Sequence, residues 1–315
     1  MKLSAQHGAI AKKYGLEGSL KILADAGFEA VDFSITGNVL SWDEGFLTDA
    51  SNPEFAEYFK NIGKIASDNN IEVCMTHAPY CPPFCADPKA YAAVQQQTIR
   101  AVYATGYMGS PYIVVHPVLH PDFNNGQNKE RCMKTNVDYF SAIVPALKDT
   151  GVIMCIENLY WGERKDPKIP NACTTANQLA ELIDTLNDMH GQHFAACLDT
   201  GHAIISGQNI NEMLQVLADR TCTLHIHDNH GILDEHMAPG TGIIDWKGVV
   251  RTLNAIDYKG CFNFETDAYW DDFRKDFFGR SVMEDAAKLL YTMGRSMVKN
   301  DTAGDSTEAE SIICG

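Results

Sequence analysis

Histidines and carboxylates in this chain repeatedly stand at the ends of short apolar runs. The residues that end these runs are His77, His116, Glu157, Asp199, His225 with His227, and Glu265. Apolar runs that end in metal-binding or acid–base residues, with helical segments between them, are typical of a parallel barrel that carries its chemistry on one rim. The pattern therefore predicts a barrel with a divalent-metal site at its C-terminal mouth.

Eight strands are predicted, and amphipathic or Ala-rich segments lie between them. The predicted strands are residues 2–6, 30–34, 71–77, 111–116, 152–157, 194–199, 222–227 and 261–265. The predicted helical segments are residues 18–27, 53–69, 90–108, 129–150, 175–190, 211–218, 246–256 and 277–298. This alternation favours an α/β fold, a single (β/α)8 TIM barrel over residues 1–299. Residues 300–315 lack an apolar period and are expected to form a flexible or loosely docked tail.

One other architecture has to be weighed, the open doubly wound sheet. Such a sheet would usually show a Gly-rich phosphate loop after its first strand, and the segment from Gly15 to Gly18 is not one. The single barrel is therefore preferred.

Composition narrows the range of partners. The chain has 315 residues, of which 45% are apolar, and a formal net charge of −16. Such a chain offers no electrostatic footprint for nucleic acid or an anionic membrane, although a compact basic groove could be hidden within an acidic total. We expect a small neutral or metal-chelated substrate, with no nucleic-acid or membrane partner.

The cysteines and the N-terminus predict a cytoplasmic location. Five of the ten cysteines lie in predicted strands, where a reduced thiol acts as a small apolar residue. The first residues run directly into a strand without a signal-peptide core, and no stretch of about 18 apolar residues could span a bilayer.

The strongest candidate site consists of four residues at successive predicted strand ends: Glu157, Asp199, His225 and Glu265. Each alone has a structural explanation, such as a helix cap, a core ion pair or a buried histidine. Together, three carboxylates and one imidazole suit a divalent ion and leave positions open for substrate oxygens. We expect one ion, with Mn²⁺ as the first choice and Mg²⁺, Co²⁺ or Zn²⁺ as alternatives.

Several motifs follow one another in a recognisable order. They are Thr76-His77-Ala78-Pro79-Tyr80, Val115-His116-Pro117, Ile156-Glu157-Asn158, Leu198-Asp199-Thr200-Gly201-His202, Leu224-His225-Ile226-His227-Asp228-Asn229, Pro239-Gly240-Thr241-Gly242 and Phe264-Glu265-Thr266. In this order they resemble the xylose-isomerase-like TIM-barrel superfamily over most of residues 1–298. This superfamily includes sugar phosphate isomerase/epimerase-type proteins, ketose 3-epimerases and endonuclease IV.

The resemblance to ketose 3-epimerases implies roles for individual residues. Glu157, Asp199, His225 and Glu265 hold the metal, with His225 preferred over His227, and the two glutamates also exchange the substrate proton. His202 and His116 are further catalytic candidates. The predicted substrate contacts are His77, Glu163, His227, Asp234, His236, Trp161 and Trp270. The family's substrate-binding arginine falls here on Gly231, which departs from the epimerase pattern.

Endonuclease IV provides a second pattern within the same resemblance. It adds five ligands to the same four, and this chain has a matching residue for each: His77, His116, His202, Asp234 and His236. A three-zinc phosphodiesterase therefore stays open. The sequence shows no basic, aromatic-interleaved loops to grip a nucleotide. Asp245-Trp246 also resembles the sugar-enzyme branch.

The sequence thus predicts a metal-dependent enzyme of carbohydrate metabolism, a sugar isomerase or epimerase. It would abstract a proton next to a carbonyl through an enediolate. The first alternative is a lyase on 3-keto-glycosides, including C-glycosides, with a small partner subunit. The second is the endonuclease IV-like phosphodiesterase, and a non-catalytic sugar- or metal-binding barrel also remains. We expect a small carbohydrate substrate, and a homo-oligomer or a complex with a small partner subunit.

Overall fold

The computed structural model describes residues 1–35, 44–79, 88–118, 129–160 and 173–299. Eight parallel strands follow their chain order in the sheet from β1 to β7, and β8 pairs with β1. A parallel bridge between Ile226 and Phe264 joins the β7 side to β8, so the barrel is nearly closed. The strands are β1 (Leu3–Gln6), β2 (Ala30–Ser34), β3 (Glu72–His77), β4 (Tyr112–Val115), β5 (Ile153–Glu157), β6 (Phe194–Asp199), β7 (Thr221–His225) and β8 (Phe262–Phe264). The predicted single (β/α)8 barrel is confirmed.

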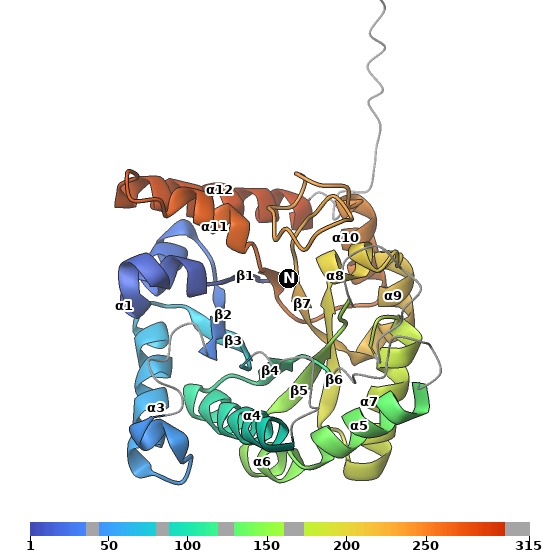
Figure 1. Cartoon of the computed structure of the whole chain (residues 1–315). Coiled ribbons are helices and arrows are strands. Elements are labelled where there is room, and N and C mark those ends of the chain that lie inside the picture. The colour runs from blue at the N-terminus through green and yellow to red at the C-terminus, as the bar shows by residue number, and fades with distance from the viewer. Residues whose placement is uncertain (36–43, 80–87, 119–128, 161–172, 300–315) are drawn as a thin grey trace, which may run out of the picture.

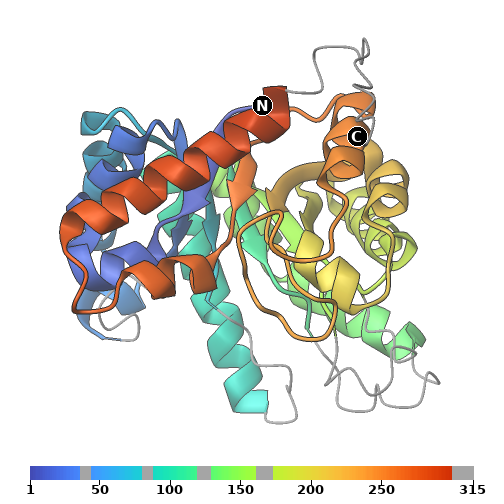
Figure 2. The same cartoon turned by 90° about the horizontal axis from the view of Figure 1, so that it is seen from above.

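Helices surround the strands, as Figure 1 shows. Figure 2, turned by 90°, shows α12 running alongside α1, against which it packs. The α-helices are α1 (Gly8–Ala26), α3 (Pro53–Asp68), α4 (Pro88–Met108), α5 (Lys129–Ser141), α6 (Val144–Thr150), α7 (Ala176–His190), α8 (Thr200–Ile205), α9 (Ile210–Leu217), α10 (Trp246–Ala255), α11 (Asp267–Phe273) and α12 (Arg280–Lys299). The 3₁₀ turns are η1 (Gly45–Thr48) and η3 (Ala218–Arg220). No helix in the described ranges is long and apolar enough to cross a bilayer.

Local sequence explains where several helices begin. Asn52 accepts a hydrogen bond from the backbone N–H of Glu54, and Pro53 opens α3. Thr175 and Gln178 form a capping box at the start of α7. These caps satisfy N–H groups that the helices themselves leave without partners, and they fix the point where each chain segment leaves the barrel.

Two helices differ from the prediction. The helix predicted over 18–27 begins already at Gly8. A non-helical Gly15 (φ 71°) kinks α1 and breaks the helical period of the sequence, which is why the first half of the helix was not predicted. The segment predicted over 129–150 is two helices, with Pro145 in the first turn of the second. The short helices α8 and α11 follow strand ends directly and were not predicted.

Small side chains and thiols fill the N-terminal half of the barrel interior. A buried cluster there consists of Ala30, Cys74, Met75, Val114, Cys155, Ala195 and Cys197. The larger apolar core lies between the strands and the helices. All seven cysteines in the described ranges are free thiols. The predicted tail, residues 300–315, lies outside the described residues.

Candidate active site

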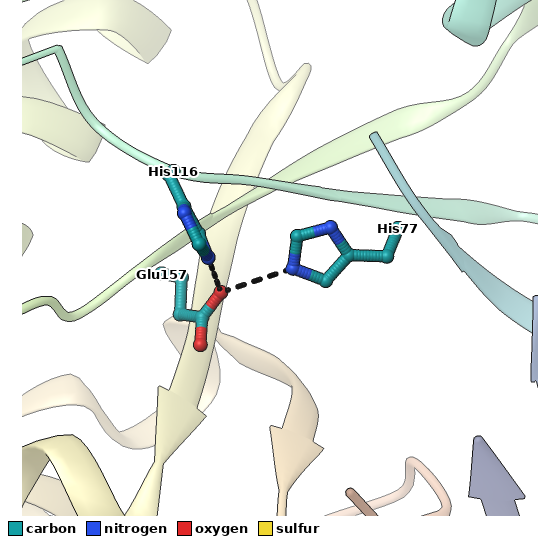
Figure 3. A group of neighbouring side chains, drawn as sticks. All are labelled: His77, His116 and Glu157. Carbon is teal, nitrogen blue, oxygen red and sulfur yellow. Dashed lines mark ion pairs between the residues drawn. The ribbon is translucent and has the colours of Figure 1, made fainter. Parts of the chain in front are cut away.

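Glu157, at the end of β5, lies at the centre of the barrel mouth. Its side chain is 1% exposed. Its Oε2 lies 2.9 Å from His116 Nε2 and 3.5 Å from His77 Nε2, an arrangement drawn in Figure 3. Its Oε1 lies 3.0 Å from His225 Nδ1 and 3.4 Å from His202 Nδ1. One carboxylate thus faces imidazoles from β7, α8 and the ends of β3 and β4.

His225, at the end of β7, links the carboxylates of the mouth. In addition to Glu157, its Nδ1 lies 3.2 Å from Glu265 Oε2 and 4.0 Å from Asp199 Oδ2. One ligand atom from each of Glu157, Asp199, His225 and Glu265 lies within 4.8 Å of the other three. The four residues predicted as metal ligands therefore converge on one small volume.

A second group lies beside the first and is carried by α8 and the segment after β7. His227 Nε2 lies 3.1 Å from Asp199 Oδ2, and the rings of His227 and His236 stack with centroids 4.2 Å apart. Asp234 Oδ2 lies 3.0 Å from His236 Nε2 and 3.4 Å from His202 Nε2. The five additional residues of the endonuclease IV pattern therefore also face the mouth.

The donor set fits a divalent cation. It offers carboxylate oxygens and imidazole nitrogens, which suit Mn²⁺, Co²⁺ and Zn²⁺. The buried Asp234 Oδ1 accepts no hydrogen bond from the described residues, whereas Glu157 Oε2 has its ion pair with His116 Nε2. A buried carboxylate oxygen without a donor is costly, and a coordinated cation would remove that cost.

The chain matches the family model described as xylose isomerase-like TIM barrel over residues 20–292. It belongs to this family. The chain is 28% identical to the uncharacterized protein MJ1311 of Methanocaldococcus jannaschii over 211 residues, 65% of this chain and 68% of that protein. It is 26% identical to the probable endonuclease 4 of Thermoplasma acidophilum over 261 residues, 75% of this chain and 83% of that protein. A further match, to the uncharacterized protein y4fM of Sinorhizobium fredii, is 25% identical and spans 50% of this chain but only 48% of that protein.

Solved structures support the same fold. The IOLI protein with a bound zinc atom superposes with a TM-score of 0.71 at 18% identity, covering 95% of this chain and 99% of that chain. A D-tagatose 3-epimerase-like protein gives a TM-score of 0.70 at 21% identity, covering 96% of this chain and 100% of that chain. At these identities the likeness shows the fold of this xylose isomerase-like barrel, and the reaction has to be argued from its own residues.

The two glutamates of this xylose isomerase-like barrel have opposite pKa shifts. Burial raises the pKa of Glu157, but the imidazoles of His225 and His116 outweigh it and hold that pKa well below its ordinary value. Burial also raises the pKa of Glu265, and His225 and His236 only partly offset this rise. Glu157 is therefore the stronger acid and Glu265 the better proton acceptor of the pair.

Asp199 is held in place by its neighbours. Its backbone N–H donates to Asn158 Oδ1 at 2.7 Å, and Asn158 Nδ2 donates to its carbonyl at 2.9 Å. Asp199 Oδ1 accepts from the His202 N–H at 2.6 Å and so caps α8. The structural reading of Asp199 as a helix cap therefore holds, and the same carboxylate still faces the mouth through Oδ2.

Two polar residues beside the site were missed by the sequence analysis. Gln6, the last residue of β1, donates from Nε2 to Glu265 Oε1 at 3.1 Å. Asp32, inside β2, lies behind His225. Gln6 ends an apolar run as the predicted residues do, so the same pattern could have found it, whereas Asp32 lies in mid-strand and gives no such signal.

The loop that carries Asp234 and His236 is organised by the buried carboxylate of Asp228. This carboxylate accepts hydrogen bonds from Trp246 Nε1 at 2.8 Å and from the N–H groups of Gly240 and Ile244 at 2.9 and 3.3 Å. A Cβ at Gly242 would collide with Asp228 Oδ1. The Pro-Gly-Thr-Gly motif is thus explained by close packing around one carboxylate.

The remaining predicted contacts are placed as follows. Glu163 and Trp161 lie outside the described residues. Trp270, in α11, is fully buried and packs against Tyr269 with ring centroids 5.1 Å apart. It therefore has no accessible surface to offer a substrate in this conformation. Gly231, where the epimerase pattern has an arginine, has a left-handed backbone (φ 71°) and lies against Ile243.

Proposed function

We propose that the protein is a divalent-metal-dependent isomerase or epimerase of a small sugar, which moves a proton at the carbon next to a carbonyl. The observation that carries this proposal is the convergence of Glu157 and Glu265, whose oxygens lie 3.0 and 3.2 Å from the same nitrogen of His225. Two carboxylates from different strands thus border one volume, as exchange of a proton on either face of a carbon requires.

Glu157, Asp199, His225 and Glu265 would hold the ion, with Mn²⁺ as the first choice. The bound ion would supply the Lewis acidity that makes a proton next to a carbonyl removable. Glu157 and Glu265 would take and return the proton, and their opposite pKa shifts make Glu265 the stronger base of the two.

The histidines and the second acidic group would bind and orient the sugar. His202 and His116 lie within 3.4 and 2.9 Å of Glu157 and are candidates to relay its proton. His77, His227, Asp234 and His236 present nitrogen and oxygen atoms to the mouth and would bind sugar hydroxyls. Glu163 and Trp161 stay predictions as substrate contacts, and the same role for Trp270 requires that this buried side chain become exposed. The lyase reading would use the same proton abstraction, followed by loss of a β-substituent.

Incorporation of deuterium from D₂O into a panel of keto sugars tests the proposal. The wild-type protein with Mn²⁺ should label the carbon next to the carbonyl, and Glu265→Gln should slow labelling at least about 10²-fold. Glu72→Gln is the matched control, because Glu72 is an exposed residue at the other end of the barrel, paired with Lys2. If the wild type labels no keto sugar, or if both variants slow labelling equally, the proposal fails.

A second candidate, the three-zinc phosphodiesterase, has two observations in its favour. His77, His116 and Glu157 form a further potential ligand group. Asp234 also lies within ion-pair distance of His202 and His236. Elemental analysis of protein purified without added metal separates the two candidates. One equivalent of metal supports the isomerase, and three equivalents of zinc with cleavage of an abasic duplex support the phosphodiesterase.

A further inference from the structure

Asp32 lies inside the barrel on β2, on the opposite side of the His225 ring from the carboxylate cluster. Both side chains are 0% exposed. His225 Nδ1 faces Glu157 and Glu265, while its Nε2 lies 3.6 Å from Asp32 Oδ2. The imidazole therefore separates two acidic environments, and each of its nitrogens faces one of them.

Neither facing group has all of its polar atoms satisfied, although Asp32 Oδ2 accepts a long hydrogen bond from Asn263 Nδ2. His225 Nε2 and Asp32 Oδ1 have no hydrogen-bond partner among the described residues. A buried imidazole N–H and a buried carboxylate are each costly without a partner. A movement of roughly 0.5 Å would bring Nε2 and the carboxylate to hydrogen-bond distance. Each group is therefore positioned to become the hydrogen-bond partner of the other.

Asp32 is itself fixed in position. The register between β2 and β3 shifts next to Asp32, because Val31 pairs with Val73 and Asp32 with Met75, which leaves Cys74 of β3 as the extra residue. Asn263 Nδ2 donates to Asp32 Oδ2 at 3.4 Å, and the ring Nδ1 of His7 lies 3.2 Å from the Asp32 carbonyl. Contacts to β8 and to the end of β1 thus hold the carboxylate behind His225.

A neutral imidazole carries one N–H, and the partner of that N–H decides which nitrogen keeps the free lone pair. A carboxylate at Nε2 favours the proton there and leaves the lone pair on Nδ1. Nδ1 is the nitrogen that faces Glu157, Asp199 and Glu265.

We propose that Asp32 is a positioning residue of the metal centre, which accepts the Nε2 proton of His225 and keeps Nδ1 free to bind the ion. This inference rests on the metal centre of the proposed function but not on the sugar reaction. Partners of this kind fix the ring orientation and raise the basicity of a ligating histidine, and their loss typically weakens metal binding about 10- to 100-fold.

The principal test is the affinity of the metal-free protein for Mn²⁺ and Zn²⁺, measured by calorimetry. Asp32→Asn is nearly isosteric, but its amide can donate to Nε2 and so favour the proton on Nδ1, where it blocks the ion. We expect a loss of affinity of about 10- to 100-fold. Thr223→Val is the matched control, because Thr223 is a buried residue on the same strand two positions before His225. It should bind metal as the wild type does.

Nuclear magnetic resonance of the zinc-loaded wild type supplies a second readout that needs no variant. The Nε2–H proton of His225 should resonate strongly downfield and exchange slowly with water, as a proton bonded to a buried carboxylate does. In Asp32→Asn that signature should be lost. Thermal unfolding of the metal-free variants shows whether a loss of affinity comes from a damaged fold.

The outcomes are separable. Wild-type affinity in Asp32→Asn, an equal loss in Thr223→Val, or an ordinary, fast-exchanging Nε2–H in the wild type would each overturn the role of Asp32. A wild type that binds metal but labels no keto sugar would instead overturn the proposed function and leave the role of Asp32 standing on its affinity data.

Discussion

The two ends of the barrel are built from the same eight strands and differ in almost every chemical respect. At the mouth, buried carboxylates and imidazoles lie within ion-pair distance of one another. At the base, the lining of a cavity of about 1060 Å³ includes three thiols, two tyrosines and six charged residues, which are Lys2, Glu29, Glu72, Asp219, Asp257 and Lys259. This cavity therefore lies at the opposite end of the barrel from the concentrated carboxylates and imidazoles.

The difference follows from what each end of a strand meets. The C-terminal ends of the strands are followed by loops and helix N-termini. Polar side chains there can therefore accept backbone hydrogen bonds, as Asp199 does when it caps α8. Side chains deeper in the barrel meet only the other strands. Burial raises the pKa of the Cys155 thiol well above its ordinary value, so this thiol stays neutral and packs as an apolar group.

The largest expected contrast lies on one strand, because β7 has His225 at the mouth and Thr221 at the base. His225→Ala should weaken metal binding and lower turnover by more than about 10²-fold, and excess metal should restore part of the turnover. Thr221→Val should change neither. Metal titration followed by turnover assays checks both variants, and equal effects would erase the distinction between the two ends.

Metal removal should destabilise the mouth selectively. A ligand present at 100 times its Kd stabilises a protein by about 2.7 kcal/mol, so a chelator should lower the Tm by roughly 5 °C. Asp199→Asn should largely abolish this shift, because its weaker site has little bound metal to lose. Differential scanning calorimetry with and without chelator measures the effect. A full shift in Asp199→Asn would show that the stabilising ion binds elsewhere.

Acid should lower the folding stability of the protein through His7, which follows β1 at the mouth end. His7 is buried and stacks on Phe33, and burial lowers the pKa of His7 from 6.5 to about 4. Below pH 6.5 His7 becomes protonated in the unfolded chain, but in the folded chain it stays neutral down to about pH 4. Folding stability therefore decreases as the pH is lowered from 6.5 to 4. The loss from His7 should reach roughly 2 kcal/mol by pH 5.

Urea unfolding of the wild type and His7→Gln between pH 7 and pH 5 measures this contribution. It is the difference between the two proteins in the slope of the free energy of unfolding against pH. The glutamine does not titrate, so the variant should lose less stability than the wild type as the pH falls. Parallel curves for the two proteins would mean that His7 titrates alike in the folded and unfolded states.

The smallest functional effect is expected at the base. Hydrogen bonding from the Cys74 thiol lowers the pKa of Cys261, which lines the cavity. Iodoacetamide should therefore label Cys261 before the buried Cys155, and turnover should stay within about twofold of the unlabelled protein. Peptide mass spectrometry combined with the turnover assay checks this. A large loss of turnover on labelling Cys261 alone would contradict this prediction, because it would show that modification at the base affects the chemistry at the mouth.

The strands were predictable because most of them are short runs of buried, largely apolar residues, as the strands of a parallel barrel are. β2 and β6 have the predicted bounds, and most other strands differ by one or two residues. The convergence of Glu157, Asp199, His225 and Glu265 also followed, since equivalent ends of parallel strands meet at one rim. Two features were missed: Gly15 interrupts α1 without ending it, and the position of Asp32 beside His225 depends on how β2 packs and pairs inside the barrel.

The single carboxylate that anchors the loop after β7 has a consequence for protein engineering. Asp228, which follows β7, accepts hydrogen bonds from Gly240, Ile244 and Trp246 at the other end of the loop. The two ends of the loop are therefore joined by contacts that do not involve its tip. The tip carries the exposed Ile232 and Leu233 next to Asp234. The exposed Ile232 and Leu233 are therefore the positions of this loop to vary when a new specificity is sought, because His230 and Gly231 still bond to Glu235 and Asn229.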